Sequence, residues 1–207
     1  ARGQCEAEIT VSGAGGHAAS VPAADNPVFG LTHVLDGLAS YDDTMGPDSD
    51  ALLGDPKLTP TIVAGGDTPN RVPDTCRLTV DRRSVPPETS EAFAASLATH
   101  LAEQTPDDQT VAVDLIDPET PFPDPFVTDS DAAIVDALQT ASGGDVRAFG
   151  AATEAAYFAP IAPTVVFGPG VLADDEGAVA HADREYIRLG DLRVAADAVT
   201  TALDTLY

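Results

Sequence analysis

The sequence contains few aromatic and few basic side chains. Tryptophan is absent, aromatic residues make up 5% of the 207 residues, and Lys57 is the single lysine among 10 basic residues. No apolar run approaches the roughly 18 residues that a transmembrane helix needs, so no membrane span is predicted. Nucleic acids and anionic membranes are bound by clusters of lysine and arginine, and the scarcity of both argues against such partners.

Cysteine is also scarce, and the start of the chain has no signal-peptide pattern. Cys5 and Cys76 stand outside any CxxC or other metal-ligand spacing, and we expect both to be small buried side chains on strands. Two isolated cysteines fit a reducing, cytoplasmic setting. Because the first residues already have a strand pattern, we expect an incomplete C-terminal portion whose earlier part lies elsewhere.

Acidic residues dominate the charge of the chain. Asp and Glu number 34 against 10 basic residues, giving a net charge of -24. They are spread over predicted loops and helix faces, as in Asp42-Asp43 and Asp107-Asp108. Dispersed carboxylates with little lysine resemble the proteins of halophilic archaea, where molar salt screens repulsion beyond about 3 Å. An ordinary acidic bacterial protein is the alternative.

Hydrophobic periodicity predicts a ferredoxin-like first domain, residues 1–117. Alternating or apolar segments predict four strands, and apolar residues at helical spacing predict two helices. Asn26 is the expected N-cap of the first helix, with Pro27 at its first position. In chain order the elements are a strand at 4–12, a helix at 27–40, strands at 58–64 and 75–81, a helix at 87–103 and a strand at 110–116. This β-α-β-β-α-β order leaves one face of the sheet free.

The proline-rich segment DPETPFPDPF marks the boundary to a second, α/β part, residues 118–207. A near-continuous apolar run at 164–167 predicts a strand that is buried on both faces. Leu192, Val199 and Leu203 are expected on the inward side of the last helix. The other elements expected here are a helix at 129–142, a short strand at 146–149, the start of a helix at 153–158 and a final helix at 189–206.

Several polar residues occupy positions suited to chemistry. His17 lies in a glycine-rich link from which its ring can reach an oxyanion, while a locally hydrogen-bonded loop histidine is the alternative that the residue alone favours. Asn70 and Arg83 flank a predicted strand, and we expect a loop and a strand end to converge there. Arg83 suits a substrate carboxylate. Surface pairing with acidic residues is the alternative for Arg82 and Arg83, and Asp81 is expected to orient an arginine.

Two further candidates lie in the second part. Gly150 and Thr153 stand before a predicted helix, where backbone N–H groups and a hydroxyl suit a carboxylate, or form a simple helix cap. His181 follows a strand and a Gly-Pro-Gly turn, near the sheet edge at which α/β proteins bind ligands. A structural histidine is the alternative there.

Four stretches, taken together and in this order, resemble one family. They are VSGAGGHAASVPAADNP, TPTIVAGGDTPNRVPDTCRLTVDRRSVPPET, GAATEAAYF and FGPG followed by AHADREYIRLGDL. The family is the zinc-dependent amidohydrolase-peptidases of acetylornithine deacetylase, succinyl-diaminopimelate desuccinylase and the glutamate-releasing carboxypeptidases. The sequence departs from the family pattern at Pro22, which is displaced by one position, at Glu154, and at Arg184, where an acidic residue is usual.

The resemblance implies a lid or dimerisation domain followed by the end of a di-zinc α/β catalytic domain. It implies that His17 reaches the active site of a partner subunit and that His181 is a zinc ligand. Asn70 and Arg83 would contact the substrate carboxylate, with Gly150 and Thr153 beside them in the substrate site. The two zinc ions of the family polarise an amide carbonyl and activate water. The sequence does not distinguish zinc from cobalt or manganese at these positions.

Two functions follow from these observations. The first is removal of an acyl group from an N-acyl amino acid, such as acetylornithine or succinyl-diaminopimelate, by a homodimer of which this chain is a C-terminal portion. The remaining metal ligands and the general-base glutamate would belong to the missing N-terminal portion. The second is a non-catalytic dimerisation or binding module derived from the same family.

Overall fold

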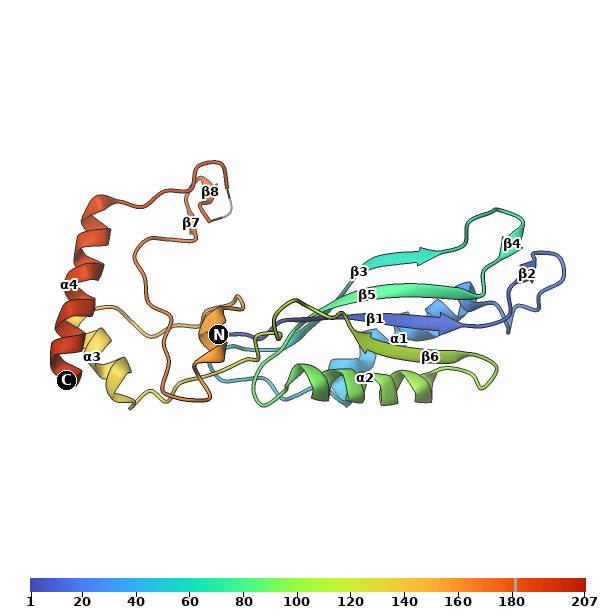
Figure 1. Ribbon diagram of the computed structural model, residues 1–207, viewed down its shortest axis with the longest axis horizontal. Coiled ribbons are helices and arrows are strands. Elements are labelled where there is room, and N and C mark those ends of the chain that lie inside the picture. The colour runs from blue at the N-terminus through green and yellow to red at the C-terminus, as the bar shows by residue number, and fades with distance from the viewer. Residues whose placement is uncertain (181) are drawn as a thin grey trace. The chain divides into compact units, whose positions relative to one another are not determined.

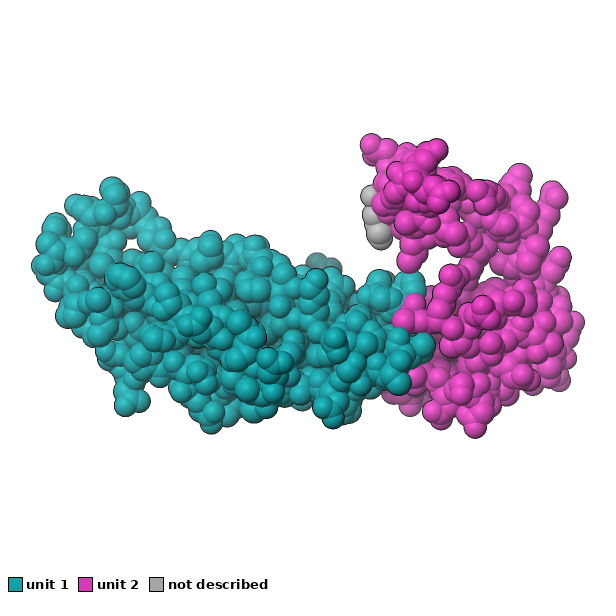
Figure 2. Space-filling model, turned by 180° about the vertical axis from the view of Figure 1, so that it is seen from behind, with its two compact units in different colours: residues 1–126, 149–156 teal, residues 127–148, 157–207 magenta. Residues whose placement is uncertain are grey.

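The computed structural model describes residues 1–180 and 182–207. The chain forms two compact units: unit 1 contains residues 1–126 and 149–156, and unit 2 contains residues 127–148 and 157–207 (Figure 2). The predicted boundary between two domains at residue 117 stays a prediction. No helix in the described part of the chain is long and apolar enough to cross a membrane.

Unit 1 is built on a four-stranded antiparallel sheet with the strand order β3-β5-β1-β6 (Figure 1). Its strands are β1 (Cys5–Ser12), β3 (Lys57–Gly65), β5 (Thr75–Arg83) and β6 (Thr110–Leu115), and its helices are α1 (Pro27–Thr44) and α2 (Ser90–Gln104). This is the split β-α-β arrangement, and it confirms the predicted ferredoxin-like order.

The hydrophobic core of unit 1 lies between one face of the sheet and the two helices. Alternate residues of β1 and β5 point into this core, as the period of two requires. The buried side chains include Cys5, Ala7, Ile9 and Val11 of β1, Leu78 and Val80 of β5, Val34, Leu38 and Tyr41 of α1, and Phe93, Leu97 and Leu101 of α2. The residues between them in β1 and β5 line the opposite face, which no helix of unit 1 covers (Figure 1).

Side-chain caps fix where the two helices of unit 1 begin. Asn26 accepts a hydrogen bond from the Val28 N–H at 3.0 Å, and Pro27 is the first helical residue, as predicted. The second helix was predicted from residue 87 but begins at Ser90. Thr89 accepts from the Ala92 N–H and therefore caps the helix there.

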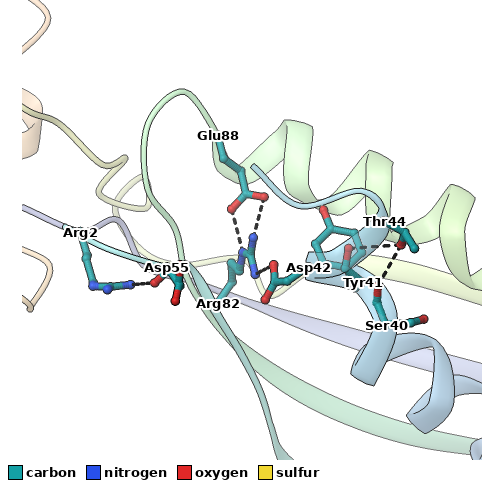
Figure 3. A network of polar contacts seen from close by, with 8 residues as sticks. All are labelled: Arg2, Ser40, Tyr41, Asp42, Thr44, Asp55, Arg82 and Glu88. Atoms are coloured by element: carbon teal, nitrogen blue, oxygen red, sulfur yellow. Dashed lines mark hydrogen bonds and ion pairs between the residues drawn. The ribbon is translucent and has the colours of Figure 1, made fainter. Parts of the chain in front are cut away.

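A wholly buried arginine links β5 to both helices (Figure 3). Arg82 donates through Nε and Nη2 to the two carboxylate oxygens of Glu88, at 2.7 and 2.9 Å, and through Nη1 to Asp42 at 2.6 Å. Its guanidinium carbon lies 5.3 Å from the ring centre of Tyr41 and 5.2 Å from that of Phe93. Surface pairing was one interpretation of Arg82, and it is wrong because this side chain is 0% exposed.

Two carboxylates compensate for the burial of Arg82. Removal from water alone would lower the pKa of the guanidinium, but its hydrogen bonds and charge attraction to Glu88 and Asp42 raise that pKa above its usual value. The pairing with Glu88 is bidentate, which fixes the angle as well as the distance. Arg82 therefore stabilises unit 1 as a fully paired ion rather than as a free charge.

The described residues of unit 2 form two helices and a short hairpin. Its elements are α3 (Ala133–Ser142), β7 (Ala173–Asp174), β8 (Gly177–Ala178) and α4 (Leu189–Leu206). The predicted helix at 129–142 begins four residues late, and the predicted strands at 146–149 and 164–167 are not formed. A strand needs a neighbouring strand to pair its backbone N–H and C=O groups. Among the described residues these two segments have only isolated bonds, from the Arg2 N–H to the Phe149 carbonyl and from the Thr128 hydroxyl to the Thr164 carbonyl.

The apolar side chains of unit 2 are largely exposed. In α4 the buried residues are the small Ala195, Ala198 and Ala202, while Leu192 and Leu203 are 46% and 51% exposed. The other buried apolar residues of unit 2 are Val135, Ala137 and Val179. The expectation that these leucines point inward is therefore wrong for the chain by itself. Phe167, predicted to lie in a strand buried on both faces, is likewise exposed. Unit 2 thus presents an unusually apolar surface.

We expect replacement of Arg82 by Met to destabilise the fold strongly. It leaves Glu88 buried without a counter-charge, which costs about 3–5 kcal/mol of unfolding free energy. Arg77→Met is the matched control, because Arg77 and Glu8 form an exposed pair worth at most about 1 kcal/mol. Urea denaturation measures both variants, and R82M/E88L should regain most of the loss. Equal stability of the two single variants would contradict this role.

The two cysteines should be unreactive in the folded chain. Cys5 and Cys76 are 2% and 1% exposed. Burial, assisted by the nearby Glu88 carboxylate, raises the pKa of Cys5 to about 12, and burial also raises the pKa of Cys76. A thiol reagent at about pH 8 should label neither until denaturant is added, because only the thiolate reacts. Thr68→Cys, at an exposed position, provides the reactive control.

Candidate functional site

Two candidate residues from distant parts of the sequence meet at one end of unit 1. His17 lies in β2 (Gly16–His17), which pairs with β4 (Arg71–Val72), and the backbone carbonyl of Asn70 accepts the Ala18 N–H at 3.0 Å. Figure 1 shows this hairpin-like pair at the end of unit 1 farthest from the N-terminus. We refer to His17, Asn70 and the β2–β4 pair as the tip.

The ring of His17 has a defined local hydrogen bond. Its Nδ1 accepts from the Ala19 N–H at 3.2 Å, and the side chain is otherwise exposed. Since Nδ1 is the acceptor, the neutral ring carries its proton on Nε2. A single chain therefore shows the locally hydrogen-bonded loop histidine that was the alternative interpretation of the sequence. The same bond leaves an outward Nε2–H donor.

Gly15 lies close to the Asp74 side chain at the tip. A Cβ atom on Gly15 would come within 2.3 Å of the Asp74 carboxylate, so a larger residue here would require this exposed side chain to move. Asp74 in turn accepts from Arg71 at 3.2 Å and accepts the Gly13 N–H through its backbone carbonyl. These contacts join the glycine-rich link to the residues just before β5.

Arg83 lies at the opposite end of β5. It donates through Nε and Nη2 to the two oxygens of Asp81, at 2.7 and 3.1 Å, and Asp81 also accepts from Gln4 at 3.4 Å. The prediction that Asp81 orients an arginine is confirmed. Arg83 also takes part in the foreseen pairing with an acidic residue, while it remains 34% exposed. Its Nη1 stays outside this pair.

A depression of about 390 Å³ lies beside Arg83 within unit 1. Its lining residues are Arg2, Asp55, Pro56, Lys57, Arg83 and Gly150. Gly150 reaches it because residues 149–156 belong to unit 1, and the Arg2 N–H donates to the Phe149 carbonyl at 3.3 Å. The structure therefore brings two of the predicted substrate contacts, Arg83 and Gly150, to one hollow.

Asn70 and Arg83 do not converge within one chain. They flank β5 at its two ends, and its nine residues span about 27 Å at 3.4 Å per residue. The expected meeting of a loop and a strand end is therefore wrong for a single copy, because the paired strand between them is extended and stiff. The candidate residues form two groups, one at the tip and one at the depression.

Thr153 lies near Gly150 but at a short 3₁₀ segment rather than an α-helix. Its hydroxyl accepts from the Ala155 N–H at 3.4 Å, just before η1 (Glu154–Tyr157). The simple-cap interpretation of this segment therefore describes one chain. A 3₁₀ turn of four residues provides no helix N-terminus of the predicted kind.

His181 lies outside the described residues, but its flanking segments are bound to one another. Arg184 forms a bidentate pair with Asp174, at 2.5 and 2.9 Å, and also donates to the Gly177 carbonyl. The hydroxyl of Tyr186 donates to Asp174 at 3.0 Å. Hydrogen bonding from Arg184 holds the pKa of Asp174 well below its usual range. Sequence reasoning noted Arg184 only as a departure from the family pattern.

The residues that the structure describes do not form a metal centre. Among residues 1–180 and 182–207, no group of three or more His, Cys, Asp or Glu side chains is placed to hold a metal ion. His181 is thus the one metal-ligand candidate that the sequence offers, and any site needs further ligands.

Sequence reasoning missed Arg2 and Lys57. Both line the depression with Arg83. Lys57 carried a signal, because it is the only lysine in the chain and its strand was predicted to begin at the next residue. The pairing register that sets it opposite Arg83 comes from the structure alone.

The chain is similar to known peptidases and deacylases. The family model described as the peptidase dimerisation domain, M20, matches residues 1–109. An acetylornithine deacetylase from Myxococcus xanthus is 30% identical, over 92% of this chain and 50% of that protein. A protein described as a succinyl-diaminopimelate desuccinylase from Mycobacterium tuberculosis is 28% identical, over 95% of this chain and 51% of that protein. The chain therefore spans about half the length of the curated relatives it matches.

Solved structures share the fold at low sequence identity. An aminopeptidase from Bacillus cereus aligns with a TM-score of 0.66 and 18% identity, over 98% of this chain and 52% of that one. An M20 family metallo-carboxypeptidase from Sulfolobus solfataricus aligns with a TM-score of 0.60 and 15% identity, over 97% of this chain and 63% of that one. These alignments show that the fold is shared.

Proposed function

Because the chain belongs to the M20 peptidase dimerisation-domain family, we propose that it forms the lid and the closing part of a metal-dependent amide hydrolase. The proposed reaction removes the acyl group from an N-acyl amino acid, such as acetylornithine or succinyl-diaminopimelate. Residues 1–117 would be the lid and residues 118–207 the end of the catalytic domain. The proposed setting is a reducing, salt-rich cytoplasm.

The observation that carries this proposal is the division of the candidate residues into two groups. His17 and Asn70 lie at the tip, whereas Arg83 and Gly150 lie at the depression at the other end of β5. A stiff strand of about 27 Å keeps them apart in one chain. In a symmetric dimer, the tip of one subunit and the depression of the other can share one site. The two groups are then two halves of the same active site.

Each half supplies a distinct interaction in the proposed reaction. The exposed Nε2–H of His17 suits an oxyanion that develops on the amide carbonyl, and the side chain of Asn70 adds a second polar group at the tip. Arg83 suits the substrate carboxylate, since its Nη1 is not used by Asp81. Closure of the tip over the substrate would exclude water from these contacts.

The apolar surface of unit 2 supports a larger catalytic domain. Exposed leucines on α4 and the exposed Phe167 have the character of core residues that lack a covering layer. We assign that layer to the N-terminal portion of the enzyme, which would also provide the metal ligands that join His181. Zinc is the proposed metal, with cobalt or manganese as alternatives, and the described residues alone do not fit such a group.

A non-catalytic dimerisation or binding module is the second candidate function. It is favoured by the lack of any group of three metal-ligating side chains among the described residues. The genomic sequence before Ala1 separates the two candidates. A reading frame that continues into an H-x-D motif and a Glu-Glu pair supports the hydrolase, whereas a start codon at this point supports the module.

We expect the chain to form a dimer through the edge of its lid sheet. The edge strand β3 exposes Ile62 and Val63, at 62% and 64%, together with unpaired backbone groups. I62K/V63K should weaken dimerisation by about tenfold or more in sedimentation velocity. Phe29→Lys, on an exposed apolar residue of α1, is the control and should leave it unchanged. A wild-type monomer in molar salt would contradict the dimer.

Mixed dimers of the complete enzyme test the shared site. In the complete reading frame that contains this chain, His17→Ala and Arg83→Gln should each reduce deacylation by about 100-fold or more. Co-expression of the two variants should restore about a quarter of the wild-type rate, because half of the dimers are mixed and each has one intact site.

The matched control combines His17→Ala with Asn70→Ala. Both substitutions lie at the tip, so every site in a mixed dimer carries one defect. The rate of the mixed dimers should therefore not exceed the mean of the rates of the two single variants. Recovery in this control, or none with Arg83→Gln although mass spectrometry shows mixed dimers, would refute the shared site. A folded wild-type enzyme that hydrolyses no N-acyl amino acid would refute the proposed reaction.

A further inference from the structure

Three of the chain's basic residues gather around one hollow. Arg2, Lys57 and Arg83 line the depression in unit 1, although the whole chain has only 10 basic residues against 34 acidic ones. Asp55 is the one carboxylate in the lining, and Asp81 is paired with Arg83. In so acidic a protein, this local excess of positive charge stands out from the surrounding field.

Lys57 faces Arg83 directly across two paired strands. The two residues are register partners in the β3–β5 ladder, so their Cβ atoms share a face about 5 Å apart. Like charges in this position repel one another. Within residues 1–180 and 182–207, no carboxylate forms an ion pair with Lys57. An anion between the two side chains would turn this repulsion into attraction.

Arg2 is held in place without losing its charge. Its guanidinium donates to the backbone carbonyls of Leu53 and Asp55, and Figure 3 shows the side chain extended toward Asp55. Carbonyl oxygens fix the position of the group but do not neutralise it. Arg2 and Arg83 are therefore both oriented in advance, the first by carbonyls and the second by Asp81, whereas Lys57 has a flexible chain.

We propose that Arg2, Lys57 and Arg83 form a carboxylate-binding site in which Lys57 is the specificity-determining residue. This inference rests on the proposed function and names the substrate class more narrowly: an N-acyl amino acid with a carboxylate that reaches Lys57. Two sources present this chemistry, the α-carboxylate of the amino acid and the terminal carboxylate of a dicarboxylic acyl group.

Binding to the chain itself tests this proposal without catalysis. N-acetylalanine presents only the α-carboxylate, and the methyl ester of N-succinylalanine presents only the acyl carboxylate. Each probe is titrated into the isotope-labelled chain, and the amide shifts of Gly150, Lys57 and Arg83 are followed by NMR. One or both probes should give saturable shifts at these residues, and the probe that binds identifies the source of the carboxylate.

Lys57→Gln should weaken the binding by about tenfold or more, while Lys57→Arg should retain most of it. Arg77→Gln is the matched control. Arg77 lies on the same face of β5 as Arg83 but outside the depression, so this substitution removes one positive charge without changing the lining. Equal weakening by K57Q and R77Q would overturn the site in favour of a general field effect. Absence of saturable shifts with both probes, or equally tight binding of sulfate, would overturn it too.

The outcome is separable from that of the proposed function. If Lys57-independent binding accompanies normal hydrolysis in the complete enzyme, only the role of Lys57 fails. If Lys57-dependent binding persists while the complete enzyme hydrolyses no N-acyl amino acid, the carboxylate site stands and the proposed reaction fails.

Discussion

The length and stiffness of β5 separate the candidate residues of the tip from those of the depression. This strand is paired on both sides, with β3 and with β1, so it cannot bend to bring its ends together. The tip that carries His17 lies at the N-terminal end of β5, and Arg83 is the last residue at its C-terminal end. A single lid therefore presents two separated partial sites, and the distance between them makes a second subunit a geometric requirement of the proposed chemistry.

The two adjacent arginines at the end of β5 lie on opposite faces of the sheet and have different roles. Side chains alternate between the faces of a strand, so Arg82 enters the core while Arg83 remains on the open face. Arg82 ties β5 to α1 through Asp42 and to the segment before α2 through Glu88. This buried ion group lies one residue from the depression, and it keeps the end of β5 rigid where Arg83 must hold its orientation.

The sequence predicted the features of the fold that depend on interactions between neighbouring residues. The alternation in β1 and the cap at Asn26 were readable, because period and capping depend on neighbouring residues. The pairing of His17 with Arg71, and the register that sets Lys57 opposite Arg83, join distant segments and leave no local signal. The apolar run at 164–167 misled for a related reason, since apolar character indicates burial only where other strands are present to cover it.

Because unit 2 exposes apolar side chains, the net charge of -24 also affects how copies of the chain associate with one another. Mutual repulsion between equally charged molecules keeps such surfaces from meeting in dilute buffer. Added salt relaxes the strain of crowded carboxylates within each molecule, but it also removes this colloidal barrier between molecules. Ionic strength thus acts on the isolated chain in two opposed ways, favouring its compact state while promoting its precipitation.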